Sequence, residues 1–271
     1  MPGIFSPAVD NSTMKVTVLA SGSKGNCTCV EGESGALLID AGLSAREARK
    51  RMAAAGLDES VVGGILVTHE HSDHLKGVDV LARRLDVPVI ATEGTLAAFL
   101  ESRKSRAEVK TEVCRPDEAL GLGDFSVTPF LTAHDAAEPC GFMVEEAGAV
   151  FGCCTDTGMI SSTMTSYFGR CDGLMLESNH CPVMLEEGPY PVFLKRRISD
   201  TKRGHLSNNA AAACLREIGG DLSSVILAHL SEVNNTPEKA YQVSETGLGL
   251  YADDVSIQVA AQHEFTPTLE V

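Results

Sequence analysis

The segment 68–74, which reads Thr-His-Glu-His-Ser-Asp-His, constrains this chain more than any other feature of the sequence. It follows a strand predicted over 64–68 and precedes a helix predicted over 75–85. Four of its residues can bind a metal ion: His69, His71, Asp73 and His74. A tight loop presents imidazoles and carboxylates from several directions, as a metal site requires. The alternative is a loop that only caps the helix, with Asp73 as the N-cap, but the full set of ligand types favours a metal site.

Apolar stretches with the spacing of strands and helices alternate along the chain, which predicts an α/β protein. The predicted strands cover 15–20, 27–31, 36–40, 64–68, 87–91, 125–133, 141–145, 149–154, 174–177, 224–228 and 256–261. The predicted helices cover 44–55, 75–85, 94–103, 161–168, 195–202, 209–218 and 237–246. Such a pattern suits two sheets packed face to face and covered by helices. Since no linker or repeat divides the chain, we expect an N-terminal tail at 1–13 and a single domain over 14–271.

The composition is that of a globular protein, and no segment is predicted to span a membrane. The longest apolar runs are short, and none reaches the roughly 18 residues that a membrane span needs. The first 13 residues lack a basic region followed by an apolar core, so they do not resemble a secretory signal. The nine cysteines lack paired Cys-x-x-Cys spacing and are expected to be reduced, buried thiols. We therefore expect a cytoplasmic protein with no membrane partner.

The formal net charge of −15 argues on its own against nucleic acid as a partner. A charge average does not detect a local cluster, however. Five cations lie within nine residues: Lys195, Arg196, Arg197, Lys202 and Arg203. This cluster is either a nucleic-acid contact or only the solvated face of a helix, and the sequence leaves both interpretations open.

The pattern at 69–74 resembles the signature of the metallo-β-lactamase superfamily, and the resemblance extends from residue 14 to about 262. The other superfamily positions have candidates in the expected order: Asp40, His134, Asp156 and His229. The resemblance implies a four-layer αββα sandwich with two divalent metal ions, zinc, manganese or iron, at one sheet edge. It implies that His69, His71 and His134 bind the first metal ion. It likewise implies that Asp73, His74 and His229 bind the second, with Asp156 bridging the two and Asp40 orienting the histidine loop.

Several shorter motifs are similar to those of the YycJ/WalJ-type branch of this superfamily, which is associated with DNA exonuclease activity. They lie at 21–26, 177–180, 188–191, 194–198, 204–208 and 229–235. One departure is Cys181, where an aspartate is expected after the Glu-x-Asn-His motif. The resemblance implies a nucleic-acid substrate, with DNA favoured over RNA, and leaves the direction of digestion and the oligomeric state open.

The residues 204–208, Gly-His-Leu-Ser-Asn, stand immediately before a predicted helix. A helix N-terminus favours phosphate, so Ser207 and Asn208 are candidate phosphate contacts beside the cationic cluster. The predicted reaction is attack of a metal-bridging hydroxide on a phosphodiester, with Asp73 in the catalytic group and His205 or His180 protonating the leaving oxygen. The alternatives are a thioester hydrolase of the glyoxalase II type and a non-catalytic metal-binding regulatory protein. His263 matches no superfamily position and is expected at the surface.

Overall fold

The computed structural model describes residues 14–271, so the tail predicted over 1–13 lies outside the described residues. The strands are β1 Lys15–Ala20, β2 Cys27–Glu31, β3 Ala36–Ile39, β4 Val62–Leu66, β5 Val89–Ala91, β6 Thr111–Val113, β7 Leu120–Leu122, β8 Phe125–Leu131, β9 Cys140–Glu146, β10 Ala149–Cys154, β11 Gly173–Glu177, β12 Ser224–Ala228, β13 Ser256–Val259 and β14 Leu269–Glu270. The helices are α1 Ala45–Ala54, α2 Ser72–Leu75, α3 Val78–Leu85, α4 Glu93–Ser102, α5 Ser162–Phe168, α6 Pro182–Glu187, α7 Val192–Ile198, α8 Asn208–Ile218 and α9 Pro237–Leu248, with 3-10 turns at Glu59–Val61 and Gly249–Tyr251.

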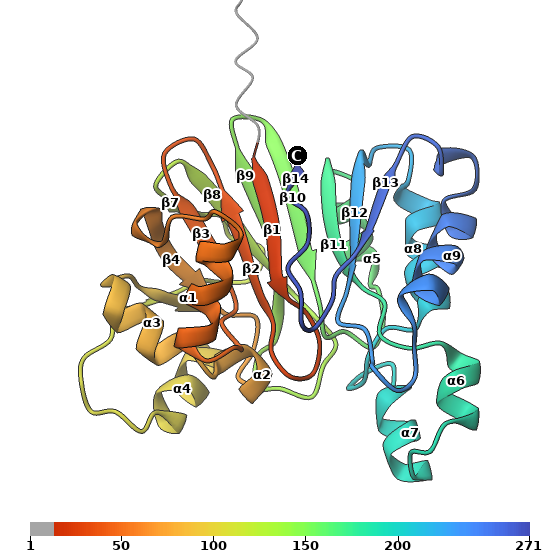
Figure 1. Ribbon diagram of the computed structural model, residues 1–271, viewed down its shortest axis with the longest axis horizontal. Coiled ribbons are helices and arrows are strands. Elements are labelled where there is room, and N and C mark those ends of the chain that lie inside the picture. The colour runs from red at the N-terminus through yellow and green to blue at the C-terminus, as the bar shows by residue number, and fades with distance from the viewer. Residues whose placement is uncertain (1–13) are drawn as a thin grey trace, which may run out of the picture.

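These strands form two seven-stranded sheets, in the orders β14-β1-β2-β3-β4-β5-β6 and β13-β12-β11-β10-β9-β8-β7. Figure 1 shows the sheets face to face, with α1, α3 and α4 outside the first sheet and α5, α8 and α9 outside the second. The fold is therefore an α/β sandwich of αββα layers, and the predicted fold class is confirmed. No helix within residues 14–271 combines the length and the apolar character that crossing a membrane requires.

Three layers of buried apolar side chains hold the sandwich together, and the alternation of side chains along each strand explains them. In β3, Leu38 packs toward the helices of the first sheet, whereas Leu37 and Ile39 pack between the sheets. In β11, Met175 faces the layer between the sheets and its neighbours face the helices of the second sheet. A strand buried on both faces needs a continuous apolar run, which is why these segments do not alternate with polar residues.

Two predicted helices differ from those in the structure. The helix predicted over 75–85 is divided at Gly77, where a Cβ atom would lie 2.4 Å from the carbonyl oxygen of Leu43, so only glycine allows this approach. The helix predicted over 195–202 begins earlier, at Val192, because Pro191 occupies its N-cap, and it ends at Ile198. Lys202 and Arg203 therefore lie in the turn after α7, not on its face. The helix α6 and the short strands β6, β7 and β14 were not predicted.

Candidate metal centre

The predicted ligands lie where strands of both sheets end. His69 follows β4 in the first sheet, while Asp156 and His229 follow β10 and β12 in the second. The strands β10, β11 and β12 are parallel neighbours, so their carboxyl ends meet at one edge. Side chains that follow such strands converge there, which is the usual place for a ligand site in sheets of this kind.

Three residues that directly follow or nearly follow strands, none of them glycine, adopt a left-handed backbone conformation. The φ angles are 58° at Asp40, 56° at Asp156 and 55° at His229. This region is sparsely populated by L-residues, and such positions gather at functional sites because the surrounding structure holds them there.

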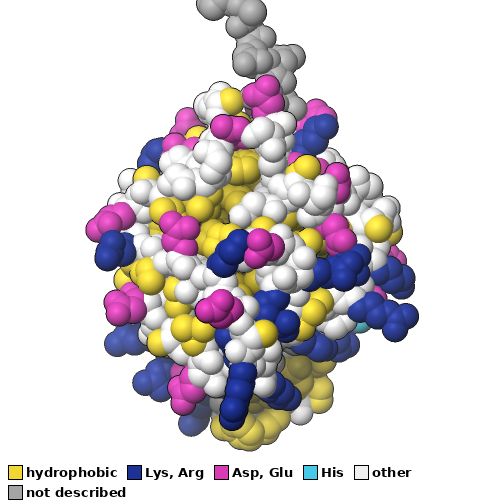
Figure 2. Space-filling model, turned by 90° about the vertical axis from the view of Figure 1, so that its left-hand side faces the viewer, with side chains coloured by type: hydrophobic (Ala, Val, Ile, Leu, Met, Phe, Trp, Pro, Cys, Tyr) yellow, Lys and Arg dark blue, Asp and Glu magenta, His cyan; other side chains and the backbone are white. Residues whose placement is uncertain are grey.

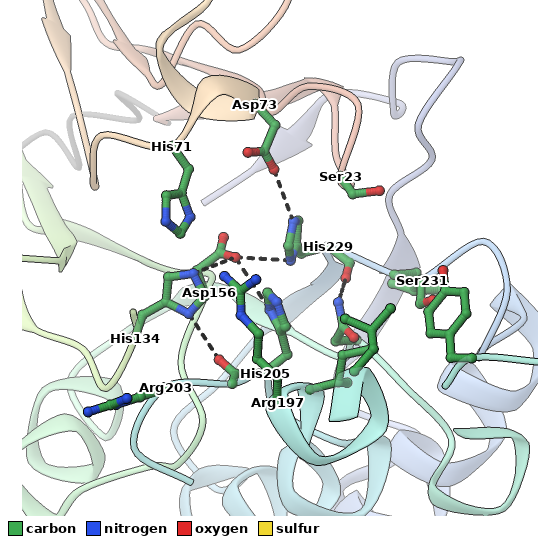
Figure 3. Close-up of a pocket in the computed structure, with 16 residues that line it drawn as sticks. Ser23, His71, Asp73, His134, Asp156, Arg197, Arg203, His205, His229 and Ser231 are labelled. Carbon is green, nitrogen blue, oxygen red and sulfur yellow. Dashed lines mark hydrogen bonds and ion pairs between the residues drawn. The ribbon is translucent and has the colours of Figure 1, made fainter. Parts of the chain in front are cut away.

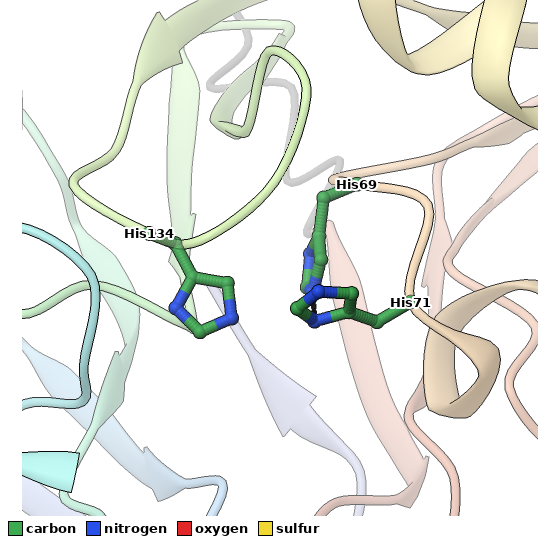
Figure 4. Close-up of side chains that lie close together, drawn as sticks. All are labelled: His69, His71 and His134. Carbon is green, nitrogen blue, oxygen red and sulfur yellow. Dashed lines mark hydrogen bonds between the residues drawn. The ribbon is translucent and has the colours of Figure 1, made fainter. Parts of the chain in front are cut away.

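Both proposed ligand sets are compact, because the candidate ligand atoms of each set all lie within 4.8 Å of one another. The first set is His69, His71 and His134, and the second is Asp73, His74 and His229. Figure 4 shows His69 and His71 approaching from the loop after β4 and His134 from the opposite side. The Nε2 atom of His69 lies 3.1 Å from Nδ1 of His71.

Asp156 lies between the two sets. Its Oδ2 atom is 3.2 Å from Nε2 of His74, and its Oδ1 atom is 3.7 Å from Nε2 of His134. Nearby histidines lower the pKa of this fully buried carboxyl well below its usual range, against the opposing effect of burial. An ionised carboxylate between two histidine groups has the position and charge that a bridging ligand needs.

Three buried polar atoms at this centre have no hydrogen-bond partner within residues 14–271: Nε2 of His134, Nε2 of His229 and Oδ2 of Asp156. Buried polar groups are almost always satisfied, so three such atoms aimed at one place call for a missing partner. The donor set is imidazole nitrogen with carboxylate oxygen, which suits zinc, manganese or iron. The residues therefore fit divalent metal ions.

Oxygen atoms hold the Nδ1 atoms of three of the proposed histidine ligands. The Nδ1 atom of His134 lies 3.0 Å from the carbonyl oxygen of Gly204, and that of His74 lies 2.7 Å from Oδ2 of Asp40. The hydroxyl of Thr68 donates to Asp40 at 2.8 Å and lies 3.0 Å from Nδ1 of His69. Such partners fix the tautomer and the ring orientation of a metal-binding histidine. The role predicted for Asp40 agrees with this geometry, whereas Thr68 and Gly204 were not predicted.

Glu177 plays the same part for His229 and also contacts His205. Its Oε1 atom lies 3.0 Å from Nδ1 of His229 and 2.8 Å from Nδ1 of His205. Its other oxygen accepts from the backbone amides of Thr157 and Leu206. Burial acts to raise the pKa of Glu177, but His205 and His229 outweigh it and lower the value to about 2. In the sequence, Glu177 stands only within the family motif at 177–180, and its position at the end of an apolar strand is the one signal of this role.

The same carboxylates change the pKa values of two histidines. Burial acts to lower the pKa of His74, but Asp40 and Asp156 outweigh it and raise the value to about 10. Burial opposes protonation of His229 as well, and Asp156, Asp73 and Glu177 together raise its pKa well above the usual value. Without metal ions, these carboxylates therefore favour the protonated form of both imidazoles.

A cavity of about 290 Å³ opens onto the centre. Five predicted ligands line it, together with residues from the α7 region: His71, Asp73, His134, Asp156, His229, Tyr190, Leu194, Arg197, Ile198, Arg203 and His205. Figure 3 shows Asp73 and His71 on one side of this space, with His205, Arg197 and Arg203 on the other. The cavity thus brings two cations of the predicted cluster to the metal centre. Lys195, Arg196 and Lys202 are outside its lining, and Lys195 donates instead to the carbonyl of Glu186.

Three other predicted site residues lie outside the cavity lining. The hydroxyl of Ser207 caps α8 by accepting from the amide of Ala210, and the side chain of Asn208 is bonded to Ser178 and Asn235. The amide of Asn208 donates to the carbonyl of His180. His180 is itself buried, and burial lowers its pKa to about 4. The roles predicted for these three residues therefore stay predictions. His263 is exposed and pairs with Glu232, as expected of a surface residue.

A two-sheet sandwich with histidines and aspartates gathered at one sheet edge defines a metal-dependent hydrolase. The family model of the beta-lactamase superfamily domain matches residues 36–230. The chain belongs to this superfamily, in its metallo-β-lactamase form, and is a metal-dependent hydrolase.

Relatives of known name are similar over most of the chain. The exodeoxyribonuclease YycJ of Bacillus anthracis is 39% identical over 226 residues, which covers 83% of this chain and 85% of the relative. The exodeoxyribonuclease WalJ of Streptococcus pneumoniae serotype 2 is 35% identical over 249 residues, covering 88% and 91%. The predicted resemblance to this branch is confirmed.

Solved structures share the fold. The metallo-β-lactamase fold protein YhfI from Bacillus subtilis superimposes with a TM-score of 0.74 at 15% identity, covering 96% of this chain and 100% of that one. The Zn²⁺-bound protein PqqB from Methylobacterium extorquens also gives a TM-score of 0.74, at 17% identity, covering 95% and 100%.

Proposed function

We propose that the protein is a dinuclear metal-dependent phosphodiesterase that degrades DNA from an end. The observation that carries this proposal is the cavity in which Arg197, Arg203 and His205 share walls with five proposed metal ligands. Cationic side chains beside a metal centre suit an anionic substrate. The relatives named as exodeoxyribonucleases support DNA as that substrate.

His69, His71 and His134 would hold one metal ion, and Asp73, His74 and His229 the other, with Asp156 shared. Bound divalent ions supply positive charge that stabilises the reacting phosphoryl group, and they activate water as the nucleophile. Arg197 and Arg203 orient the phosphate in the cavity. Asp73, which is part of the second set and lines the cavity, keeps its proposed place in the catalytic group.

His205 is the better placed of the two proposed proton donors. It lines the cavity, whereas His180 is buried outside its lining. Glu177 accepts from Nδ1 of His205, which leaves Nε2 to give a proton to the leaving oxygen. The proton returns to this nitrogen from solvent after the product leaves.

A thioester hydrolase gains nothing from Arg197 and Arg203, and a regulatory protein without activity does not need the Glu177–His205 pair. The deciding experiment compares metal-loaded protein on end-labelled DNA, end-labelled RNA and a glutathione thioester. We expect release of nucleotides from DNA ends, loss of this activity in His71→Ala and retention in His263→Ala, a surface histidine. Thioester cleavage without nuclease activity would overturn the proposal.

A further inference from the structure

We propose that the segment 182–203, which we call the α6–α7 arm, binds an unpaired DNA strand end, and that Phe193 stacks on one of its bases. This inference rests on the proposed function and specifies the form of the substrate. Figure 1 shows the arm projecting from the body at the lower end of the molecule, beside the loops that carry the metal centre.

The helix α7 presents two different faces. Tyr190, Leu194, Arg197 and Ile198 line the cavity. The adjacent stripe leaves Phe193 74% exposed and Val192 63% exposed, and α7 buries no side chain fully. A large aromatic group this exposed beside a ligand cavity is a typical sign of a binding surface. Residues four apart are neighbours on a helix, so Phe193 lies next to Arg197 and continues the cavity wall outward.

The charge of the arm points to a polyanion as the occupant of this surface. α7 carries three cations, Lys195, Arg196 and Arg197, and no acid, although the whole chain has a net charge of −15. The acids of the arm, Glu186, Glu187 and Asp200, lie outside α7. On the face shown in Figure 2, which lies across the molecule from the arm, Lys and Arg are interspersed with Asp and Glu.

An unpaired strand fits this combination better than a duplex. The cavity of about 290 Å³ is at the small end of ligand pockets, so it admits a group of nucleotide size. Aromatic side chains next to cations bind single strands because every unpaired base offers a face for stacking, whereas a paired base inside a duplex does not. Phe193 would stack on a base close to the terminal nucleotide, and Arg196 and Arg197 would contact the flanking phosphates.

The test measures binding by fluorescence anisotropy on metal-loaded protein, with a phosphorothioate oligothymidylate that resists cleavage and a blunt duplex of equal length. Phe193→Ala should weaken single-strand binding by about tenfold or more and change duplex binding little. Phe193→Trp, which keeps an aromatic ring at this position, should bind the single strand with an affinity within about threefold of the wild type. The matched control is Leu250→Ala, since Leu250 is 95% exposed and lies outside the arm.

Three outcomes would overturn the inference. One is unchanged single-strand binding by Phe193→Ala, and a second is equal weakening of both forms of DNA. The third is that Phe193→Ala leaves DNA binding intact but changes another property of the protein. A changed oligomeric state would assign the patch to a second copy of the chain, and weaker binding to anionic vesicles would assign it to a lipid surface. Wild-type hydrolysis of bis(p-nitrophenyl) phosphate tests the proposed function separately: if it is absent, the proposed function fails, whatever Phe193 does.

Discussion

The Nδ1 atom of His205 lies 2.8 Å from the Oε1 atom of Glu177, and the same oxygen lies 3.0 Å from Nδ1 of His229. One buried carboxylate thus orients both a proposed metal ligand and the proposed proton donor. Their separation in the sequence, 28 residues for the first pair and 52 for the second, hides this connection until the chain is folded.

Glu177→Gln should slow DNA hydrolysis by about 10²- to 10⁴-fold, the usual contribution of a positioned general acid. The amide loses the charge that holds the imidazoles, while its size is kept. Hydrolysis of bis(p-nitrophenyl) phosphate should fall less, by at most about 10- to 100-fold from the weakened support of His229, because its leaving group needs no proton. Steady-state rates on both substrates measure the difference. The control is Glu217→Gln, an exposed residue on α8; equal losses on both substrates would argue against the proton-donor role.

Asp156→Asn should lower hydrolysis by orders of magnitude and leave the fold intact. Asparagine tolerates the left-handed backbone that Asp156 adopts, so the turn is preserved while the bridging charge is lost. Elemental analysis should show fewer metal ions per chain, and circular dichroism an unchanged spectrum. Asp254→Asn, at an exposed site, should change neither. Full activity in Asp156→Asn would contradict a bridging role.

Asp40→Asn should weaken metal binding by about 10- to 100-fold, the range typical of residues that orient metal ligands. Asparagine also tolerates the φ angle of 58° at this position, but it cannot hold the Nδ1 proton of His74 as a carboxylate does. Competition with a chromogenic chelator measures the affinity. The prediction is wrong if the affinity is unchanged while the protein remains folded.

Metal affinity should rise with pH between pH 6 and 8. The pKa of His74 is raised to about 10, and that of His229 is raised well above its usual value. These shifts favour the imidazolium form in the metal-free protein, and each ring must lose its Nε2 proton to bind a metal ion while Nδ1 keeps its own. Calorimetric titration in two buffers of different ionisation enthalpy should therefore detect proton release. Metal binding without proton release would show that these histidines are neutral or remain unbound.

Replacing Arg197 and Arg203 by alanine should weaken DNA binding and flatten its dependence on salt. Each lost phosphate contact lowers the slope of log K against log salt by about 0.7 for a single strand. The control replaces Lys104 and Arg106, which lie in the loop after α4 and outside the cavity lining. The same slope in both double variants would mean that Arg197 and Arg203 do not contact phosphate.

The sequence was most informative where ligands are close together or end a strand. The loop 69–74 stood out because its residue types are rare at that density, and His134, Asp156 and His229 could be placed because each follows an apolar strand. The link from Glu177 to two histidines, and that from the Gly204 carbonyl to His134, could not be predicted, because they join residues that only the fold brings together. The helix predicted over 195–202 starts three residues earlier in the structure, at Val192, where the apolar residues 192–194 precede the cations and Pro191 occupies the N-cap.

The left-handed backbone at Asp40, Asp156 and His229 lowers the stability of the fold at positions that the proposed activity needs. Each such residue costs about 1–3 kcal/mol of folding free energy when it is not glycine. Selection for heat resistance alone would therefore favour glycine or asparagine at these three positions, because both adopt this backbone readily. The result would be a more robust sandwich without a complete metal centre. Laboratory evolution of this protein for stability must therefore also select for activity in every round, because stabilising substitutions at these positions would remove the metal centre.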